Sequence, residues 1–178
     1  MKKLLFLLAL LVVSPVSRSA DEGKTITFDR ESYTLGWVDA SNGTTTNEFY
    51  LPGEKPEDWT RMIGIRHFSG ARQLKDAVNP WMAMVKPLIA AKPDAYEGNS
   101  KTGGKGVTIV VWLLSPDKKY YEYDMMRFVE TPDGVMSYQF AEKLPFAKKL
   151  DVSATMKSLD ERLDELKAFA MTAQTEMR

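Results

Sequence analysis

The sequence predicts an α+β domain in which a mostly antiparallel β-sheet is packed by one long central helix and a C-terminal helix. Several segments alternate apolar and polar residues between short turns rich in Pro, Gly and Asn, which is typical of strands joined in hairpins. Two other segments, one in mid-chain and one at the C-terminus, carry apolar residues at helical spacing. Consecutive hairpins imply antiparallel pairing, and the helices must then cover the sheet.

The first three strands are expected in residues 24–28, 32–38 and 44–51. The first of them is short and suits the edge of a sheet. Asn42 and Gly43 join the second to the third, because an Asn-Gly pair readily supplies the positive φ angles of a tight hairpin turn. Pro52 and Gly53 end the third strand, since proline cannot donate to a ladder and glycine accepts the geometry of a turn.

A polar corner containing Trp59 leads into a strand expected over residues 62–68. The Trp59 ring is expected to pack over the end of the sheet. Side chains alternate along a strand, so Ile63, Ile65 and His67 lie on one face. The opposite face carries Met62, Gly64, Arg66 and Phe68. A glycine inside a strand indicates a bulge or the close approach of another backbone.

Residues 71–92 are expected to form the long central helix. An apolar stripe with spacings of four and three residues predicts it, and its members are Leu74, Val78, Trp81, Val85 and Leu88. Pro80 and Pro87 share a face away from this stripe. The helix is expected to kink or divide at Pro80, with Asn79 capping the second half. Two shorter helices are the alternative.

The second half of the chain predicts a loop, three strands and a helix. Residues 95–106 are polar and glycine-rich and are expected to form a mobile loop. Residues 107–114 are apolar on both faces, which favours the central strand of the sheet. Two further strands are expected in residues 119–130 and 135–141. The C-terminal helix has Ser153 as a candidate N-cap and should lie across the sheet through a narrow apolar stripe, formed by Met156, Leu159, Leu163, Leu166 and Ala170.

The N-terminus has the three-part plan of a secretory signal peptide. A positively charged start precedes an apolar run over residues 4–13, and the small residues Ser17 and Ser19 suit cleavage after Ser19. The run is short against the roughly 20 residues that span a membrane, and an uncleaved anchor is the alternative. The expected organisation is a signal peptide in residues 1–19 and a single α+β domain in residues 20–178, exported to the periplasm or secreted.

Charge and composition limit the expected partners. The chain has 24 basic and 24 acidic residues, and removal of Lys2, Lys3 and Arg18 with the signal leaves a net charge of about −3. No dense basic block is present, so nucleic acid is not an expected partner. The absence of cysteine excludes disulfides and cysteine-based metal, redox and nucleophilic chemistry. The sequence predicts no cofactor, and no membrane span after signal removal.

No recognisable catalytic constellation accompanies the titratable residues. His67 is the only histidine. The sequence offers it neither a nucleophile elbow nor partners at metal-ligand spacing, so a structural or surface role is expected. The run 98–106 departs from P-loop spacing and precedes a strand, so it is expected to be a flexible loop. A general-acid pair would need two carboxyls that face each other across a cleft. Solvated positions are the default for the carboxylates of this chain. The candidates are Glu54, Glu57, Asp58, Glu122, Asp124 and Glu130.

Aromatic residues crowd several strands and supply the candidate binding site. Burial on both faces of the sheet explains most of them. An excess on one face would form a binding groove or a partner surface, where Tyr and Trp are favoured. The candidate binding residues are Trp59, Trp112, Tyr121, Tyr123, Arg66 and His67.

The corner Tyr50-Leu51-Pro52-Gly53-Glu54, followed closely by Trp59 and a strand in a short exported chain, resembles a group of uncharacterised envelope proteins of Gram-negative bacteria. The element order is similar, more distantly, to the PsbP/Mog1-like sandwich, an antiparallel sheet between helices. These resemblances imply a non-catalytic accessory or binding module. They transfer no catalytic residue to this chain, and fold analogy alone is a weak basis for function.

The expected function is therefore that of an exported, periplasmic, non-catalytic binding or accessory protein, acting on an envelope protein or a small ligand that the sequence does not specify. One alternative is a small hydrolase that uses carboxylates or His67. Another is a helix-mediated envelope assembly subunit, because the narrow stripe of the C-terminal helix could pair with a second copy.

Overall fold

The computed structural model describes residues 23–99, 105–147 and 159–176. The expected signal peptide and the Ser153 cap lie outside these residues. Within these residues, eight strands and three helical segments follow one another, in the order β1 (Thr25–Phe28), β2 (Glu31–Ser41), β3 (Thr44–Tyr50), β4 (Arg61–Phe68), α1 (Leu74–Val85), η1 (Lys86–Leu88), β5 (Asp94–Asn99), β6 (Lys105–Leu114), β7 (Tyr120–Thr131), β8 (Gly134–Pro145) and α3 (Leu159–Glu176).

The strands form one antiparallel sheet in the order β1-β2-β3-β4-β8-β7-β6-β5. Strands β1 to β4 make one meander and β5 to β8 make another, and the pairing of β4 with β8 joins them. The β2–β3 hairpin turns at Asn42 and Gly43, whose φ angles of 52° and 73° match the expected Asn-Gly turn. The antiparallel architecture predicted from consecutive hairpins is confirmed.

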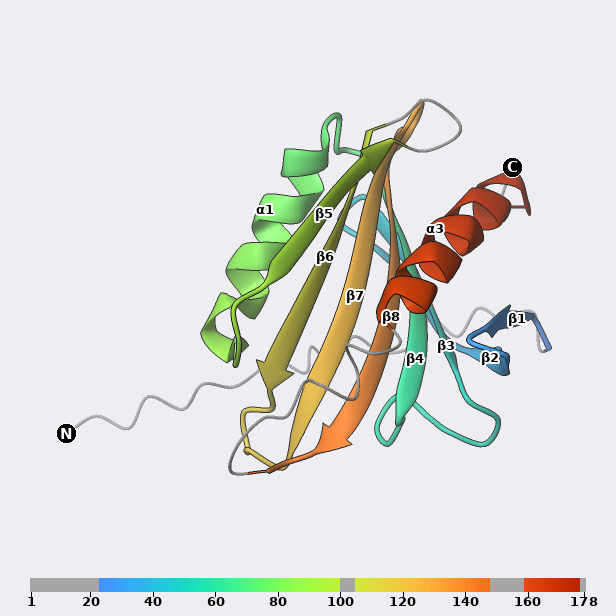
Figure 1. Cartoon of the computed structure of the whole chain (residues 1–178). Coiled ribbons are helices and arrows are strands. Elements are labelled where there is room, and N and C mark those ends of the chain that lie inside the picture. The colour runs from blue at the N-terminus through green and yellow to red at the C-terminus, as the bar shows by residue number, and fades with distance from the viewer. Residues whose placement is uncertain (1–22, 100–104, 148–158, 177–178) are drawn as a thin grey trace.

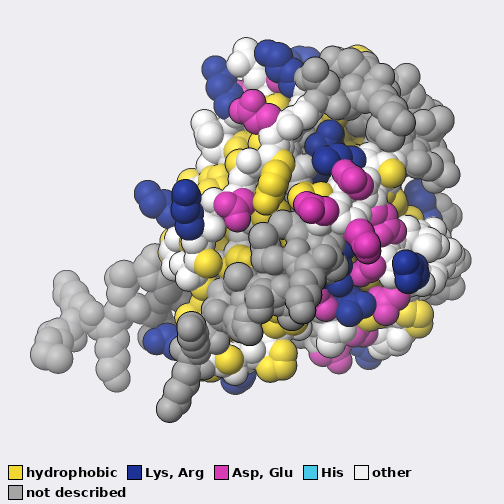
Figure 2. Space-filling view, viewed as in Figure 1, with side chains coloured by type: hydrophobic (Ala, Val, Ile, Leu, Met, Phe, Trp, Pro, Cys, Tyr) yellow, Lys and Arg dark blue, Asp and Glu magenta, His cyan; other side chains and the backbone are white. Residues whose placement is uncertain are grey.

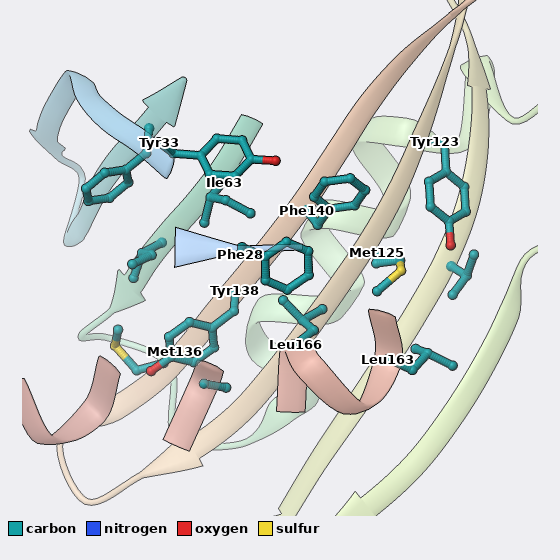
Figure 3. Close-up of a cluster of buried hydrophobic side chains, with 14 of the residues drawn as sticks. Phe28, Tyr33, Ile63, Tyr123, Met125, Met136, Tyr138, Phe140, Leu163 and Leu166 are labelled. Atoms are coloured by element: carbon teal, nitrogen blue, oxygen red, sulfur yellow. The ribbon is translucent and has the colours of Figure 1, made fainter. Parts of the chain in front are cut away.

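The two helices cover opposite faces of the sheet (Figure 1). Helix α1 packs on what we call the α1 face, over a cluster that includes Ile109, Val111 and Phe128. Helix α3 packs on the α3 face, where Leu163 and Leu166 bury themselves among the aromatic side chains of the larger core cluster (Figure 3). The side chain of Leu159 is outside the described set.

The prediction of one long helix over residues 71–92 is wrong. Helix α1 spans only Leu74–Val85, and a short 3₁₀ segment follows. The helix begins at a capping box in which the Asp76 carboxylate accepts hydrogen bonds from the Arg72 and Gln73 amides at 3.0 and 2.9 Å. It then continues through Pro80, so Asn79 caps no second half. The α-helix ends instead just before Pro87. This proline lies in the first residues of the 3₁₀ segment, where a missing N–H group costs little.

Two further expectations concerning β5 and β6 are also wrong. Residues 107–114 were expected to form the central strand, but β6 lies second from the edge. Its two apolar faces are explained by burial under α1 on one side and in the core cluster of the α3 face on the other. Residues 95–106 were expected to be a loop, yet β5 pairs with β6 from Asp94 to Asn99. An edge strand needs only one ladder and little apolar side chain, so a polar, glycine-rich segment can form it.

Candidate functional site

A row of charged and amide side chains crosses four neighbouring strands on the α1 face. We call it the polar row, and it consists of Glu48 on β3, Arg66 on β4, Gln139 on β8, and Asp124 and Glu122 on β7. Strand alternation points all five toward the same face. Register aligns Glu48 with Gly64 and Gly64 with Gln139. The polar row therefore occupies the part of this face beside the apolar contact of α1.

Hydrogen bonds connect the polar row from end to end. The Arg66 guanidinium donates from Nη2 to Glu48 Oε1 at 2.9 Å and from Nη1 to Gln139 Oε1 at 2.6 Å. The Gln139 amide then donates from Nε2 to Asp124 Oδ1 at 2.7 Å. At the other end the Tyr50 hydroxyl donates to Glu48 Oε2 at 2.6 Å. Arg66, Gln139 and Asp124 thus bond to neighbours on adjacent strands, and Glu48 also accepts from Tyr50 on its own strand, as buried polar groups require.

Gly64 provides the space in which the Arg66 side chain crosses the sheet. A Cβ at this position would lie 2.7 Å from Arg66 Nη1 and 3.1 Å from Gln139 Oε1. The bulge or backbone approach expected at Gly64 is wrong: side chains of the polar row come close instead, and β4 runs through this point without a break in register.

The two carboxyls at the β7 end of the polar row resist ionisation. Burial raises the pKa of Glu122, and the neighbouring Asp124 charge raises it further. Burial also raises the pKa of Asp124, although hydrogen bonds from Gln139 and Glu122 and the charge of Arg66 oppose this rise. Asp124 is 2 % exposed. Protonated Glu122 donating to ionised Asp124 is the arrangement that these contacts favour, because two adjacent buried carboxylates repel each other.

Trp59 and Lys143 lie at the end of the sheet next to Glu122. The Lys143 ammonium sits 3.9 Å from the centroid of the Trp59 ring and 5.1 Å from that of Tyr120, within the range of cation–π attraction. Burial lowers the pKa of Lys143, against the charges of Glu122, Glu54 and Asp58. The Trp59 ring packs beside Tyr50, Met62 and Ala141, as expected for a cover over the sheet end.

The structure divides the six candidate binding residues between the two faces. Trp59 and Arg66 lie on the α1 face. The other three aromatics lie on the α3 face, where Trp112 and Tyr123 are 4 % and 0 % exposed and their ring centroids are 4.7 Å apart. Tyr121 is also buried, and its hydroxyl donates to the Ala147 carbonyl at 3.2 Å. These three aromatic side chains belong to the core.

His67 stands apart from both groups, at the end of β4. Its Nε2 atom is 3.3 Å from the Asp133 carbonyl oxygen and 3.9 Å from an Asp133 carboxylate oxygen, at the β7–β8 turn. Strand alternation places its side chain on the face opposite Arg66. His67 is therefore not brought together with the carboxyls of the polar row.

Sequence reasoning missed Glu48, Gln139 and Lys143. The alternation of their strands carries a signal, because each falls on the same face as Arg66, Asp124 or Glu122 once the register is known. That register joins β4 to β8 across more than 70 residues of sequence, as the 73-residue separation of Arg66 and Gln139 shows. No local pattern encodes such a pairing.

A second charged network holds α3 to the sheet. Arg162 of α3 pairs with Asp29 at 3.0 Å and with Glu142 at 3.2 Å, and Glu142 also pairs with Arg61 at 3.0 Å. Figure 2 shows acidic and basic side chains next to one another around α3, with no large block of one sign on this view of the molecule. Each charged group in this network is paired with an opposite charge of the same network. We interpret the network as a structural contact between α3 and the sheet.

The described residues offer neither a cluster of metal ligands nor a membrane-spanning helix. No group of three or more His, Asp or Glu side chains that could hold a metal ion occurs in them. None of the helices in the described part of the chain has the length and apolar character needed to cross a membrane.

The fold and the polar row define a protein built on one antiparallel sheet between two helices, with a charged network on one face. The chain belongs to an uncharacterised protein family, whose family model matches residues 21–173. No curated protein matches the chain. Among solved structures, the protein of unknown function PA94 from Pseudomonas aeruginosa is similar with a TM-score of 0.44 and 14 % identity, over 80 % of this chain and 94 % of that chain.

Proposed function

We propose that this protein is an exported, periplasmic, non-catalytic binding protein whose binding surface is the α1 face around the polar row and Trp59. The polar row carries this proposal. Holding charges in a half-buried position is rarely the most stable way to fill a sheet face. Four ionisable side chains and one amide, joined across four strands, therefore support a role beyond stability.

The ligand that fits this surface carries a hydrogen-bond donor or a cationic group beside a flat apolar part. The partly exposed Glu122 carboxyl offers an acceptor, and buried Asp124 shares its proton from behind. Trp59 is partly exposed next to them and offers a ring face for stacking. A small ligand or a side chain of an envelope protein could supply such a group.

The cellular place of this binding function rests on the sequence. The charged start, short apolar core and small residues before position 20 support export. The Tyr50-to-Glu54 corner and its resemblance to Gram-negative envelope proteins, together with the PsbP/Mog1-like element order, support an accessory role in the periplasm. These parts of the proposal are tested by fractionation of cells that produce the full chain.

One observation favours hydrolysis as a second candidate function. Glu122 and Asp124 lie on the same face of β7 with raised pKa values, which is how a general acid is prepared. Asp124 is nevertheless buried and committed to Gln139, and His67 lies on the other face. The third idea, assembly through the C-terminal helix, loses support at Leu163 and Leu166, which are buried against the chain's own sheet.

The test is tryptophan fluorescence of the purified protein during a screen of small cationic ligands and envelope extracts. Binding at the polar row is expected to shift the emission of wild type and of Trp112→Phe, and to leave Trp59→Phe without response. Glu122→Gln is expected to weaken the shift. A response that survives Trp59→Phe and Glu122→Gln but is lost in Trp112→Phe would place the ligand elsewhere. Turnover of an ester or glycoside, lost in Glu122→Gln, would favour the hydrolase.

A further inference from the structure

Arg127 is an arginine buried on the α3 face with no acidic partner among the described residues. It lies on β7 and is 4 % exposed. Its Nη1 atom donates to the Thr108 hydroxyl at 3.1 Å, while its buried Nε atom donates to no described residue. Burial lowers the pKa of this guanidinium. A buried cation without a counter-ion is costly, so an anion beside Arg127 would be held strongly.

Next to this guanidinium, two glycines leave a strip over which no other described side chain lies. Gly98 on β5 and Gly106 on β6 are direct partners in the sheet. A Cβ at Gly106 would lie 2.9 Å from Arg127 Nη2, so the guanidinium rests over this glycine. Gly98 is exposed, and no described atom lies within 4 Å of the position that its Cβ would take. The strip therefore runs from the buried guanidinium to the exposed edge strand.

We propose that Arg127, Thr108 and the Gly98–Gly106 pair form a binding site for a carboxylate group. Thr108 engages Nη1, which leaves the edge formed by Nε and Nη2. Two parallel N–H donors on that edge match the two oxygens of a carboxylate. Nη2 is the donor next to the glycine strip, so the anion approaches over Gly98. This site lies on the face opposite the polar row and is independent of the function proposed there.

The experiment uses the purified protein and acetate as the probe, with chloride at matched ionic strength as the reference. Acetate is expected to raise the melting temperature in a saturable way and to shift the Arg127 Nε–H resonance, which is identified by its absence in Arg127→Met. Arg127→Met is expected to weaken acetate binding at least about tenfold, because a charge-assisted bidentate contact is lost. Without acetate this variant is expected to melt no lower than wild type.

A pair of glycine variants separates the site from general stability. Gly98→Ala adds a methyl group where no described atom lies within 4 Å, so it should leave the fold intact while blocking the strip and weakening acetate binding. Gly70→Ala also meets no described atom within 4 Å, and it should bind acetate like wild type. Equal acetate effects in wild type and Arg127→Met, or none in wild type, would overturn the proposal. Preference for phosphate or sulfate over acetate would overturn the carboxylate assignment.

Discussion

Two arginines on opposite faces of the same sheet differ in the hydrogen-bond partners that surround them. Arg66 on the α1 face has Glu48 on one side and Gln139 on the other, with hydrogen bonds of 2.9 and 2.6 Å. Arg127 on the α3 face is more deeply buried and has one hydrogen bond, to a neutral hydroxyl. Each guanidinium lies over a glycine, which is Gly64 of the same strand for Arg66 and Gly106 of the adjacent strand for Arg127.

The difference teaches how a sheet face can accommodate a cation. On the α1 face the described residues supply a carboxylate and an amide to Arg66, which is one link in a chain of hydrogen bonds. On the α3 face the described residues supply one partner and a strip of bare backbone, which suits an anion from outside. Removing a member of the first arrangement is therefore expected to lower the free energy of unfolding. Removing the cation of the second is expected to change it little.

Replacing each arginine by methionine is the strongest way to break this comparison. Arg66→Met leaves the Glu48 carboxylate and the Gln139 carbonyl without their donor, and it is expected to lower the free energy of unfolding by about 3 kcal/mol. That value is at the lower end for a broken ion pair because the Arg66 side chain is 20 % exposed. Arg127→Met is expected to be neutral or to gain about 1 kcal/mol. Urea denaturation followed by circular dichroism measures both, and equal losses would contradict the comparison.

Two glycines, Gly64 beneath Arg66 and Gly98 on the edge strand, test the comparison with a smaller effect. Gly64→Ala places a methyl group 2.7 Å from Arg66 Nη1 and 3.1 Å from Gln139 Oε1, so the guanidinium must move and its hydrogen bonds lengthen. We expect a loss of about 2 kcal/mol. Gly98→Ala, in open space, is the matched control and is expected to change stability by less than about 1 kcal/mol. The same denaturation measurement applies, and a neutral Gly64→Ala would show that the network tolerates displacement.

The sequence predicts the turns and the faces of individual strands, but it does not predict which distant strands pair. The Asn42-Gly43 turn and the face carried by Arg66 follow from turn chemistry and from a period of two, which are local properties. The partner Gln139 could not be predicted because the β4–β8 pairing joins distant parts of the chain. The segment around Gly98 has the sequence pattern of a loop, because a polar edge strand shows little apolar alternation. The aromatics Trp112 and Tyr123 were candidate binders because alternation cannot say which face α3 covers.

The smallest expected effect concerns the shared proton at the β7 end of the polar row. Burial raises the pKa of Glu122 and Asp124 above the ordinary carboxyl values of about 4. The folded protein therefore binds more protons than the unfolded chain above that pH, and the free energy of unfolding must fall as pH rises from about 5 through neutrality. The charges of Arg66 and Lys143 oppose this fall only in part, since both carboxyl shifts remain upward.

Glu122→Gln isolates this contribution because an amide keeps the size of the side chain and cannot titrate. Its free energy of unfolding is expected to fall less steeply than that of wild type between pH 5 and 8, with a difference of about 1 kcal/mol or more at the alkaline end. Urea denaturation at a series of pH values measures it. Asp117→Asn is a suitable control, since hydrogen bonds from Lys119 and Ser115 lower the pKa of that exposed carboxyl and its contribution is already complete at pH 5. Parallel slopes for wild type and Glu122→Gln would mean that the two carboxyls share no proton, and the polar row would then have to be regarded as a fully ionised network.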